Sequence, residues 1–223
     1  MEKKQYKLDL HTHSIISYDG GITAAQYEKV LLSGVLDVVA ITDHNETKFA
    51  RMLQKSFGER IIVGEEIMTT EGEIIGLFLQ ETITPYNSAP ATVNEIVRQN
   101  GLVYIPHPFE TLRKGLEQES LQTIVDKLAI IEVFNGRGKW RNKNILAEEF
   151  ARKHTLAMAA SSDSHGFWGI GKTYSLVSQS PTKKHLVRLL QEGSLQKTYA
   201  PLISYLEPLM NKIKNKIILT GNR

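Results

Sequence analysis

The amino-acid sequence predicts an α/β fold in which the strands form a mainly parallel sheet. Short runs rich in Val, Ile and Leu alternate with amphipathic stretches, which is the pattern of repeated β/α units. The 223 residues are enough for one domain with a core of barrel or doubly wound size. Polar segments follow directly after several of the apolar runs, and α/β barrels build their active sites at such strand ends. The alternation alone leaves open whether the sheet closes into a barrel.

Seven segments have the composition of strands, and five have the pattern of helices. Strands are expected at 6–10, 36–42, 61–67, 74–79, 102–105, 129–134 and 156–160. Helices are expected between them, at 23–33, 46–57, 88–100, 121–127 and 143–153. Thr23 is a suitable N-cap, Pro90 lies in the first turn of the third helix, and Gly34 and Gly101 are suited to positions that end helices. We expect one domain over residues 1–200, followed by an amphipathic C-terminal helix with a basic end over 201–223.

Composition narrows the class of protein. The chain is 41% hydrophobic and 23% charged, and its net charge of +3 is too small to predict a stable complex with nucleic acid. It contains no cysteine, so any metal ligands would have to be nitrogen or oxygen donors. No apolar run approaches the roughly 18 residues of a membrane span, and the first residues lack the pattern of a signal peptide. We expect a cytoplasmic protein that does not associate with membranes.

Five polar segments follow the expected strands and contain five of the seven histidines. They are His11-Thr12-His13, Thr42-Asp43-His44, Gly64-Glu65-Glu66, Pro106-His107-Pro108 and Ser162-Asp163-Ser164-His165. Because side chains alternate along a strand, His11 and His13 point the same way and can bind one ion together. Asp43 is expected to orient an imidazole through its ring N–H or, alternatively, to accept a proton.

This combination of side chains predicts a metal centre. Neutral imidazoles and carboxylates are ligands of Zn²⁺, Mn²⁺ and Fe²⁺. The candidate ligands are His11, His13, Asp19, His44, Glu66, His107, Asp163 and His165. Eight ligands are too many for one four-coordinate ion, so we expect two or three divalent ions that share Glu66. The residue types do not decide between manganese, zinc and iron.

The same segments resemble the PHP (polymerase and histidinol phosphatase) family of metal-dependent phosphoesterases, in order and spacing from residue 6 to about 180. The resemblance implies a distorted seven-stranded (β/α) TIM-like barrel of PHP type. It assigns His11, His13, Glu66 and Asp163 to a first ion, and Asp19, His44 and His165 to a second. Glu66 and His107 would hold a third ion. Where many members supply a further histidine to that ion, this chain has Asn135, which is a weaker ligand.

Cationic and aromatic residues near these segments favour a phosphorylated substrate. Arg137 and Lys172 follow strand ends and can bind phosphate, while Asn135 and Trp168 are further candidates for substrate contact, the latter by stacking on a ring. We expect a metal-dependent phosphoesterase that hydrolyses a small phosphomonoester or a nucleotide or oligonucleotide phosphate with metal-activated water. Two alternatives stay open: the same ions could hydrolyse an amide or lactone, or the protein could bind metal or ligand without catalysis.

One motif points to a different class of protein. Residues 166–173 match the P-loop pattern G-x-x-x-x-G-K-[ST] letter for letter. A P-loop needs a helix directly after it, whereas residues 174–178 have an extended pattern. We therefore expect a turn beside the active site and not a nucleotide triphosphate site.

Overall fold

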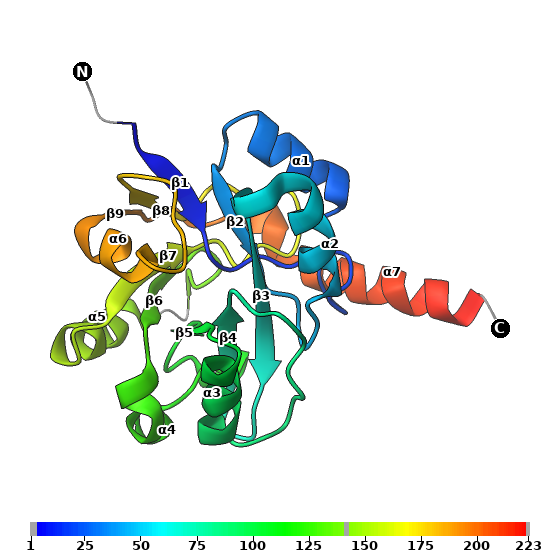
Figure 1. The fold of residues 1–223 in the computed structure, drawn as a ribbon. Helices are drawn as coiled ribbons and strands as arrows, with labels where there is room; N and C mark the ends of the chain where they lie inside the picture. Colours follow the sequence, from blue (N-terminus) through cyan, green and yellow to red (C-terminus); the bar gives the residue numbers. More distant parts are fainter. Residues whose placement is uncertain (1–3, 141–142, 222–223) are drawn as a thin grey trace.

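The structure, a computed structural model, describes residues 4–140 and 143–221. In these residues nine strands form one sheet in the order β7-β6-β5-β4-β3-β2-β1-β8-β9 (Figure 1). The strands are β1 (Tyr6–Asp9), β2 (Val38–Ile41), β3 (Ile61–Met68), β4 (Glu73–Leu77), β5 (Leu102–Ile105), β6 (Ile130–Asn135), β7 (Ala157–Ser161), β8 (Tyr174–Val177) and β9 (Ser194–Gln196). The seven expected strands are all present, and β8 and β9 are additional.

The sheet is mixed, which differs from the mainly parallel sheet expected from the sequence. Four neighbouring pairs are parallel: β1 with β2, β2 with β3, β5 with β6, and β6 with β7. The other four pairs are antiparallel, because β4 runs against both of its neighbours and β8 runs against β1 and β9. The strand β4 reverses direction because only a short turn separates it from β3, and such a turn cannot make a parallel crossover.

The two ends of the sheet come together, so the sheet is a nearly closed barrel. The hydroxyl of Ser175 on β8 donates to the carbonyl of Ala160 on β7 at 3.3 Å, and the Ala160 N–H donates to that hydroxyl at 3.1 Å. Beyond the carboxyl ends of β1 and β7, Thr12 and Ser164 form an isolated parallel bridge. The barrel is thus closed at the end where the polar segments lie.

Most of the helices lie around the sheet, and the C-terminal one extends away from it (Figure 1). They are α1 (Ala24–Leu32), α2 (Lys48–Phe57), α3 (Ala89–Arg98), α4 (Gln118–Ile124), α5 (Asn144–Lys153), α6 (Leu186–Glu192) and α7 (Glu207–Gly221). Short 3-10 segments are η1 (Gly58–Arg60), η2 (Thr111–Arg113), η3 (Val125–Lys127) and η4 (Leu202–Tyr205). Within the described residues, no helix is both long enough and apolar enough to cross a lipid bilayer.

Local sequence signals explain how the helices begin and end. Thr23 caps α1 with a capping box: its hydroxyl accepts from the Gln26 N–H, and the Gln26 side chain accepts from the Thr23 N–H. Gly34 has the expected left-handed φ of +69° after α1. After α3 the left-handed residue is Asn100 (φ +59°), not Gly101. Gly101 is needed for space, because a Cβ atom there would lie 2.9 Å from the Leu77 carbonyl oxygen.

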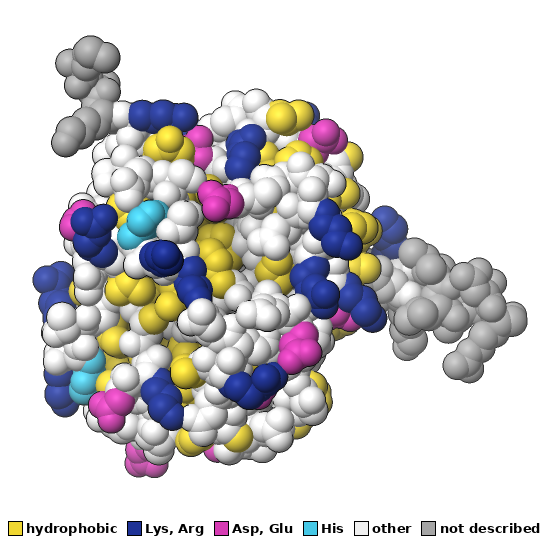
Figure 2. Space-filling model, viewed as in Figure 1, with side chains coloured by type: hydrophobic (Ala, Val, Ile, Leu, Met, Phe, Trp, Pro, Cys, Tyr) yellow, Lys and Arg dark blue, Asp and Glu magenta, His cyan; other side chains and the backbone are white. Residues whose placement is uncertain are grey.

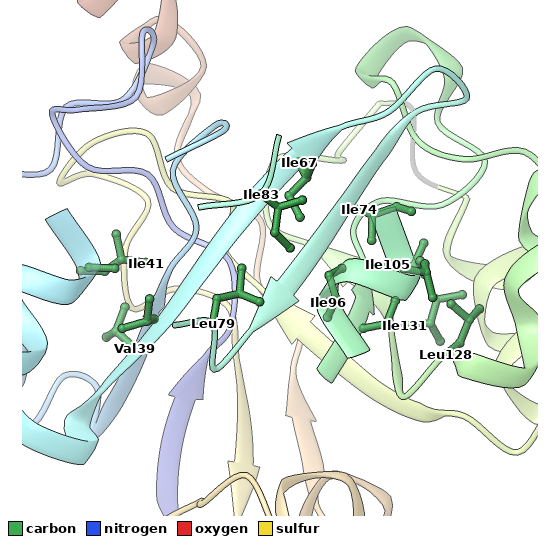
Figure 3. Close-up of a cluster of buried hydrophobic side chains, with 14 of the residues drawn as sticks. Val39, Ile41, Ile67, Ile74, Leu79, Ile83, Ile96, Ile105, Leu128 and Ile131 are labelled. Atoms are coloured by element: carbon green, nitrogen blue, oxygen red, sulfur yellow. The ribbon is translucent and has the colours of Figure 1, made fainter. Parts of the chain in front are cut away.

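Alternate strand residues pack into two hydrophobic cores. Val39 and Ile41 on β2 belong to the core between the sheet and the outer helices, part of which Figure 3 shows. Val38 and Ala40 on the same strand face the second core, together with leucines of α6. Because both faces of the strands are buried, the sequences of these strands are nearly continuous apolar runs. On the face shown in Figure 2, lysine and arginine side chains are spread among acidic and neutral ones.

Candidate metal centre

The polar segments at the carboxyl ends of the strands converge on one point. Backbone pairing continues past the strands and fixes this arrangement: the His13 N–H donates to the Ser164 carbonyl at 2.9 Å, and His44 forms a parallel bridge with Glu66. The eight candidate ligands are all buried or nearly so. The structure therefore brings together all eight side chains that the sequence nominated.

The first cluster has the geometry of an ion cage. The Nε2 atoms of His11 and His13 lie 3.1 Å apart, and each is 3.5 Å from Asp163 Oδ1. The Glu66 carboxylate lies 3.4 Å from His11 Nε2 and 3.3 Å from His13 Nε2. Four ligand atoms about 2.1 Å from a tetrahedral ion lie roughly 3.4 Å apart. These four side chains fit a common divalent ion.

The second cluster lies beside the first. Asp19 Oδ1 is 3.5 Å from Nε2 of both His44 and His165. The ring of His13 lies against both imidazoles, with centroid distances of 4.7 Å to His44 and 4.1 Å to His165. Burial acts to raise the pKa of Asp19, but the imidazoles of His165 and His44 outweigh it and lower that pKa below its usual range. The carboxylate is therefore ionised, as a metal ligand must be.

A third cluster surrounds the other side of Glu66. Its Oε1 atom lies 3.2 Å from His107 Nε2, and its Oε2 atom lies 3.2 Å from His44 Nδ1. Glu73, the first residue of β4, faces the same two imidazoles. Burial and the nearby charges of Glu66 and Asp163 raise the pKa of Glu73 to about 10. The sequence analysis missed Glu73; its only signal was an acidic residue at the start of an apolar run.

Asn135 does not complete this third cluster in the way a histidine would. Its Nδ2 atom donates to Glu132 and, at 3.3 Å, to Asp163 Oδ2. Its Oδ1 atom accepts from Arg113 at 3.1 Å and from the Arg137 N–H at 2.9 Å. The amide is thus engaged at both ends, and it positions Arg113 and Asp163.

Glu132 is a second residue that the sequence analysis missed. Its Oε2 atom accepts a hydrogen bond from His11 Nδ1 at 3.0 Å and another from the Tyr104 hydroxyl at 2.6 Å. A carboxylate on Nδ1 leaves Nε2 free to bind metal. Burial acts to lower the pKa of His11, but the carboxylates of Asp163 and Glu66 raise it well above its usual range.

Asp43 was expected to orient an imidazole ring, and the structure gives it a different role. Its carboxylate accepts from the Ser14 N–H at 2.7 Å and from the Ser14 hydroxyl at 2.6 Å, so it fastens the loop after β1 to the end of β2. The partner of His13 Nδ1 is instead Ser17 Oγ, at 3.2 Å. Burial raises the pKa of Asp43. Its alternative role as a proton acceptor stays a prediction.

Six of the eight candidate metal ligands line a cavity of about 740 Å³, and they are Asp19, His44, Glu66, His107, Asp163 and His165. Cationic side chains in its wall are Arg113, Lys114, Arg137 and Lys212. Arg113 pairs with Asp163, and Arg137 Nη1 lies 3.5 Å from Asp163 Oδ1, which places both guanidinium groups beside the first cluster. The rings of Trp140 and Tyr205 also line the cavity, with centroids 5.0 Å apart.

Trp168 and Lys172 do not line this cavity, in contrast to their predicted contact with substrate. Both side chains are exposed. Their turn packs toward the C-terminal helix: the Trp168 N–H donates to Glu207 Oε1 at 3.3 Å. The turn leads into β8 and not into a helix, which confirms that the P-loop pattern is coincidental.

The helix α7 connects the two loops of the second cluster. The side-chain amide of Asn211 donates to the carbonyl of Asp19 at 3.0 Å and to that of His165 at 2.8 Å. One turn along, Asn215 donates to the Tyr18 carbonyl at 3.2 Å. Lys212 Nζ lies 3.7 Å from Asp19 Oδ2. Within the expected helical segment 201–223 the structure has η4 and then α7, and residues 222 and 223 lie outside the described part; Asn211 and Lys212 of α7 contact the second cluster.

Fold and site together define a class: α/β barrels that hold a cluster of histidines and carboxylates at the carboxyl ends of their strands. Residues 141–195 match the PHP-associated family. The chain is 35% identical over 185 residues to the uncharacterised protein MJ0417 of Methanocaldococcus jannaschii, covering 80% of this chain and 73% of that protein. The chain belongs to the PHP-domain family, which confirms the resemblance found in the sequence.

Solved structures share the fold at low identity. A two-domain protein of Bacteroides vulgatus that contains a predicted PHP-like metal-dependent phosphoesterase superposes with a TM-score of 0.68 and 17% identity, over 94% of this chain and 70% of that one. An amidohydrolase of Chromobacterium violaceum superposes with a TM-score of 0.56 and 16% identity, over 71% of this chain and 87% of that one. The barrel is thus similar to those of proteins with different described activities.

Proposed function

We propose that this protein is a metal-dependent phosphoesterase that hydrolyses a small phosphomonoester or a nucleotide or oligonucleotide phosphate. One observation carries the proposal: overlapping groups of candidate metal ligands lie at a cavity whose wall presents Arg113, Arg137 and Lys212. Carboxylates and imidazoles bind divalent ions, and guanidinium groups bind phosphoryl oxygens in a forked geometry. An enzyme for phosphate esters needs both kinds of group in one cavity.

We propose that two or three divalent ions bind here, and the charged state of the carboxylates supports the binding of cations. Burial acts to raise the pKa of Asp163, but His11 and Arg113 hold that pKa well below its usual range. Burial acts in the same way on Glu66, and His11 and His44 hold its pKa well below the usual range. Manganese, zinc and iron all suit these donors. Bound ions of this kind lower the pKa of a coordinated water and neutralise charge on phosphoryl oxygens.

The chain's own residues would orient the substrate. Arg113 and Arg137 approach the first cluster from the cavity wall and can hold two phosphoryl oxygens, while Lys212 adds a point charge beside the second cluster. The rings of Trp140 and Tyr205 give the cavity an aromatic side that suits a base or another flat ring. Trp140 thus replaces Trp168 as the candidate for stacking. The substrate is expected to be small, because the net charge of +3 gives little general attraction for nucleic acid.

A second candidate is hydrolysis of an amide or lactone by the same ions. The shared fold with an amidohydrolase keeps this candidate open. The cations in the wall favour phosphate, since a neutral amide needs no such charge. A binding protein without turnover is less consistent with the open volume of about 740 Å³ directly above the ligands.

The test is an assay of the purified protein after loading with Mn²⁺, Zn²⁺ or Fe²⁺. Release of inorganic phosphate from a panel of phosphomonoesters, nucleotides and short oligonucleotides should depend on the added ion. The same preparation is assayed against amides and lactones. Asp163→Asn, which removes the charge of a candidate ligand of the first ion, should lose the activity. Hydrolysis of amides or lactones with no phosphate release would favour the second candidate, and metal binding without any hydrolysis would favour the binding protein.

A further inference from the structure

Glu73 is a buried carboxylate on the floor of the cavity, and neither the sequence motifs nor the family resemblance gives it a role. It lies at the start of β4, where it pairs with Met68 of β3. Its N–H donates to the Lys114 carbonyl at 2.7 Å, which fixes the backbone. The residue is only 5% exposed. Its position is therefore set by the sheet and not by a mobile loop.

The carboxylate of Glu73 faces the same two imidazoles as the carboxylate of Glu66. Glu73 Oε1 lies 3.6 Å from His44 Nδ1, and Oε2 lies 3.7 Å from His107 Nε2. These separations are longer than hydrogen bonds but close to the roughly 3.4 Å between ligands of one ion. His107 Nε2 is also 3.2 Å from Glu66 Oε1. His107 Nε2 thus faces a carboxylate oxygen of Glu66 and one of Glu73, and ligand atoms of Glu66, Glu73 and His44 lie within 4.8 Å of one another.

A divalent ion bound there would balance the charge of two ionised carboxylates. Glu66 and Glu73 are both buried, and among the described residues the ion-pair partners of Glu73 are the imidazoles of His44 and His107 and not a lysine or arginine. A buried carboxylate without a cation is costly. Asn135, the residue at the place of the missing histidine, is hydrogen-bonded to other groups at both ends. A third ion would therefore need a ligand from somewhere else.

We infer that Glu73 supplies this ligand, so that a third divalent ion is bound by Glu66, His107 and Glu73. The inference rests on the metal centre of the proposed function and deepens it. The chain replaces an imidazole on one strand with a carboxylate on another. The added negative charge also makes this position more suited to hard ions such as Mn²⁺ than a second histidine would.

The test counts ions and does not depend on turnover. The protein, stripped with chelator and reloaded with Mn²⁺, is studied by calorimetric titration and by elemental analysis after gel filtration. Glu73→Gln keeps the shape of the side chain and removes its charge. We expect this variant to bind one ion fewer per chain, or to bind its weakest ion at least about tenfold more weakly. His107→Ala should lose the same ion, and the double variant should lose no more than either single one.

Glu65→Gln is the matched control, because Glu65 is the buried neighbour of Glu66 that points away from the centre and accepts the Ile83 N–H at 2.8 Å. It should bind as many ions as the wild type. If Glu73→Gln binds the same number of ions with unchanged affinity, the inference is wrong while the metal centre stands. If the wild type binds no ion, the proposed function fails as well. If Glu73→Gln does not fold, Glu73→Asp, which draws the carboxylate back by one methylene, should weaken the same ion.

Discussion

Glu132 and His11 form a buried hydrogen bond of 3.0 Å between Oε2 and Nδ1, although they are far apart in the sequence. Tyr104 donates to the same carboxylate, and its hydroxyl lies 2.9 Å from Ser161 Oγ. The imidazole of this candidate ligand is thus held by a chain of hydrogen bonds that joins His11, Glu132, Tyr104 and Ser161. This chain fixes both the direction of the ring and the nitrogen that is free to bind metal.

Glu132→Gln should weaken metal binding without unfolding the protein. The amide keeps the size of the side chain but loses the charge that increases the basicity of His11, so we expect about 10-fold to 100-fold weaker binding of the first ion. Titration with Mn²⁺ measures the change. Tyr104→Phe, which leaves the carboxylate in place, should have a smaller effect. Unchanged affinity in Glu132→Gln would show that this carboxylate does not tune the ligand.

Arg137→Ala should mainly raise KM for phosphorylated substrates. A charged hydrogen bond contributes about 1.5–3 kcal/mol, which corresponds to roughly 10-fold to 100-fold in KM. Steady-state kinetics on the best substrate provide the measurement, with ion content measured in parallel because Arg137 lies near Asp163 and His165. Lys172→Ala is the comparison, since Lys172 is exposed and outside the cavity. An unchanged KM for Arg137→Ala would remove this residue from the substrate site.

Removal of bound ions should lower the thermal stability, because the centre then leaves several carboxylates buried close together. An ion that is present at 100 times its dissociation constant stabilises the folded state by about 2.7 kcal/mol. For a domain of this size the melting temperature should rise by roughly 5–10 °C with Mn²⁺ relative to chelated protein. Asp163→Asn should show a smaller rise. Equal melting temperatures in chelator and in Mn²⁺ would contradict an intact metal centre.

Glu65→Gln should change the pH dependence of stability. The Glu65 side chain points away from the candidate metal ligands. Burial raises the pKa of Glu65 to about 8, although the Ile83 N–H opposes this. The folded state therefore holds this proton more tightly than the unfolded state does, and the wild type loses stability as the pH rises from about 4.5 to about 8. The variant lacks this loss, which is on the order of a few kcal/mol.

Urea unfolding at pH 5 and pH 9 measures the effect of this substitution. The two proteins should have similar stabilities at pH 5, and Glu65→Gln should be the more stable at pH 9. A constant difference across this range would show that Glu65 is not protonated in the folded protein.

The sequence was sufficient to nominate the eight side chains that the structure brings together, but not the carboxylates beside them. His11, His13 and Asp163 were predictable, because residues that follow parallel strands meet at one end of the barrel. Glu73 and Glu132 were not, because both lie within strands that are buried on both faces, where neither periodicity nor composition tells which side chain points to the site. Trp168 and Lys172 were misplaced for another reason. Their turn is directed by its contact with α7, which local sequence does not reveal.

The strands β8 and β9 and the helix α6 were also missing from the predicted set. They are short, and their patterns resemble those of the loops around them. The extended character of residues 174–178 was visible in the sequence, but not its pairing with β1. That pairing depends on contacts between distant parts of the chain, and it accounts for the two strands beyond the seven expected.

The double hydrogen bond of Asn211 has a consequence for biosynthesis. Asn211 follows every candidate metal ligand in the chain, yet it joins the Asp19 loop to the His165 loop. A nascent chain that has already emerged with all its ligands still lacks this connection. The two loops can be fastened to each other only after the ribosome has released the start of α7, so the second cluster acquires its final shape as a late event in the maturation of the protein.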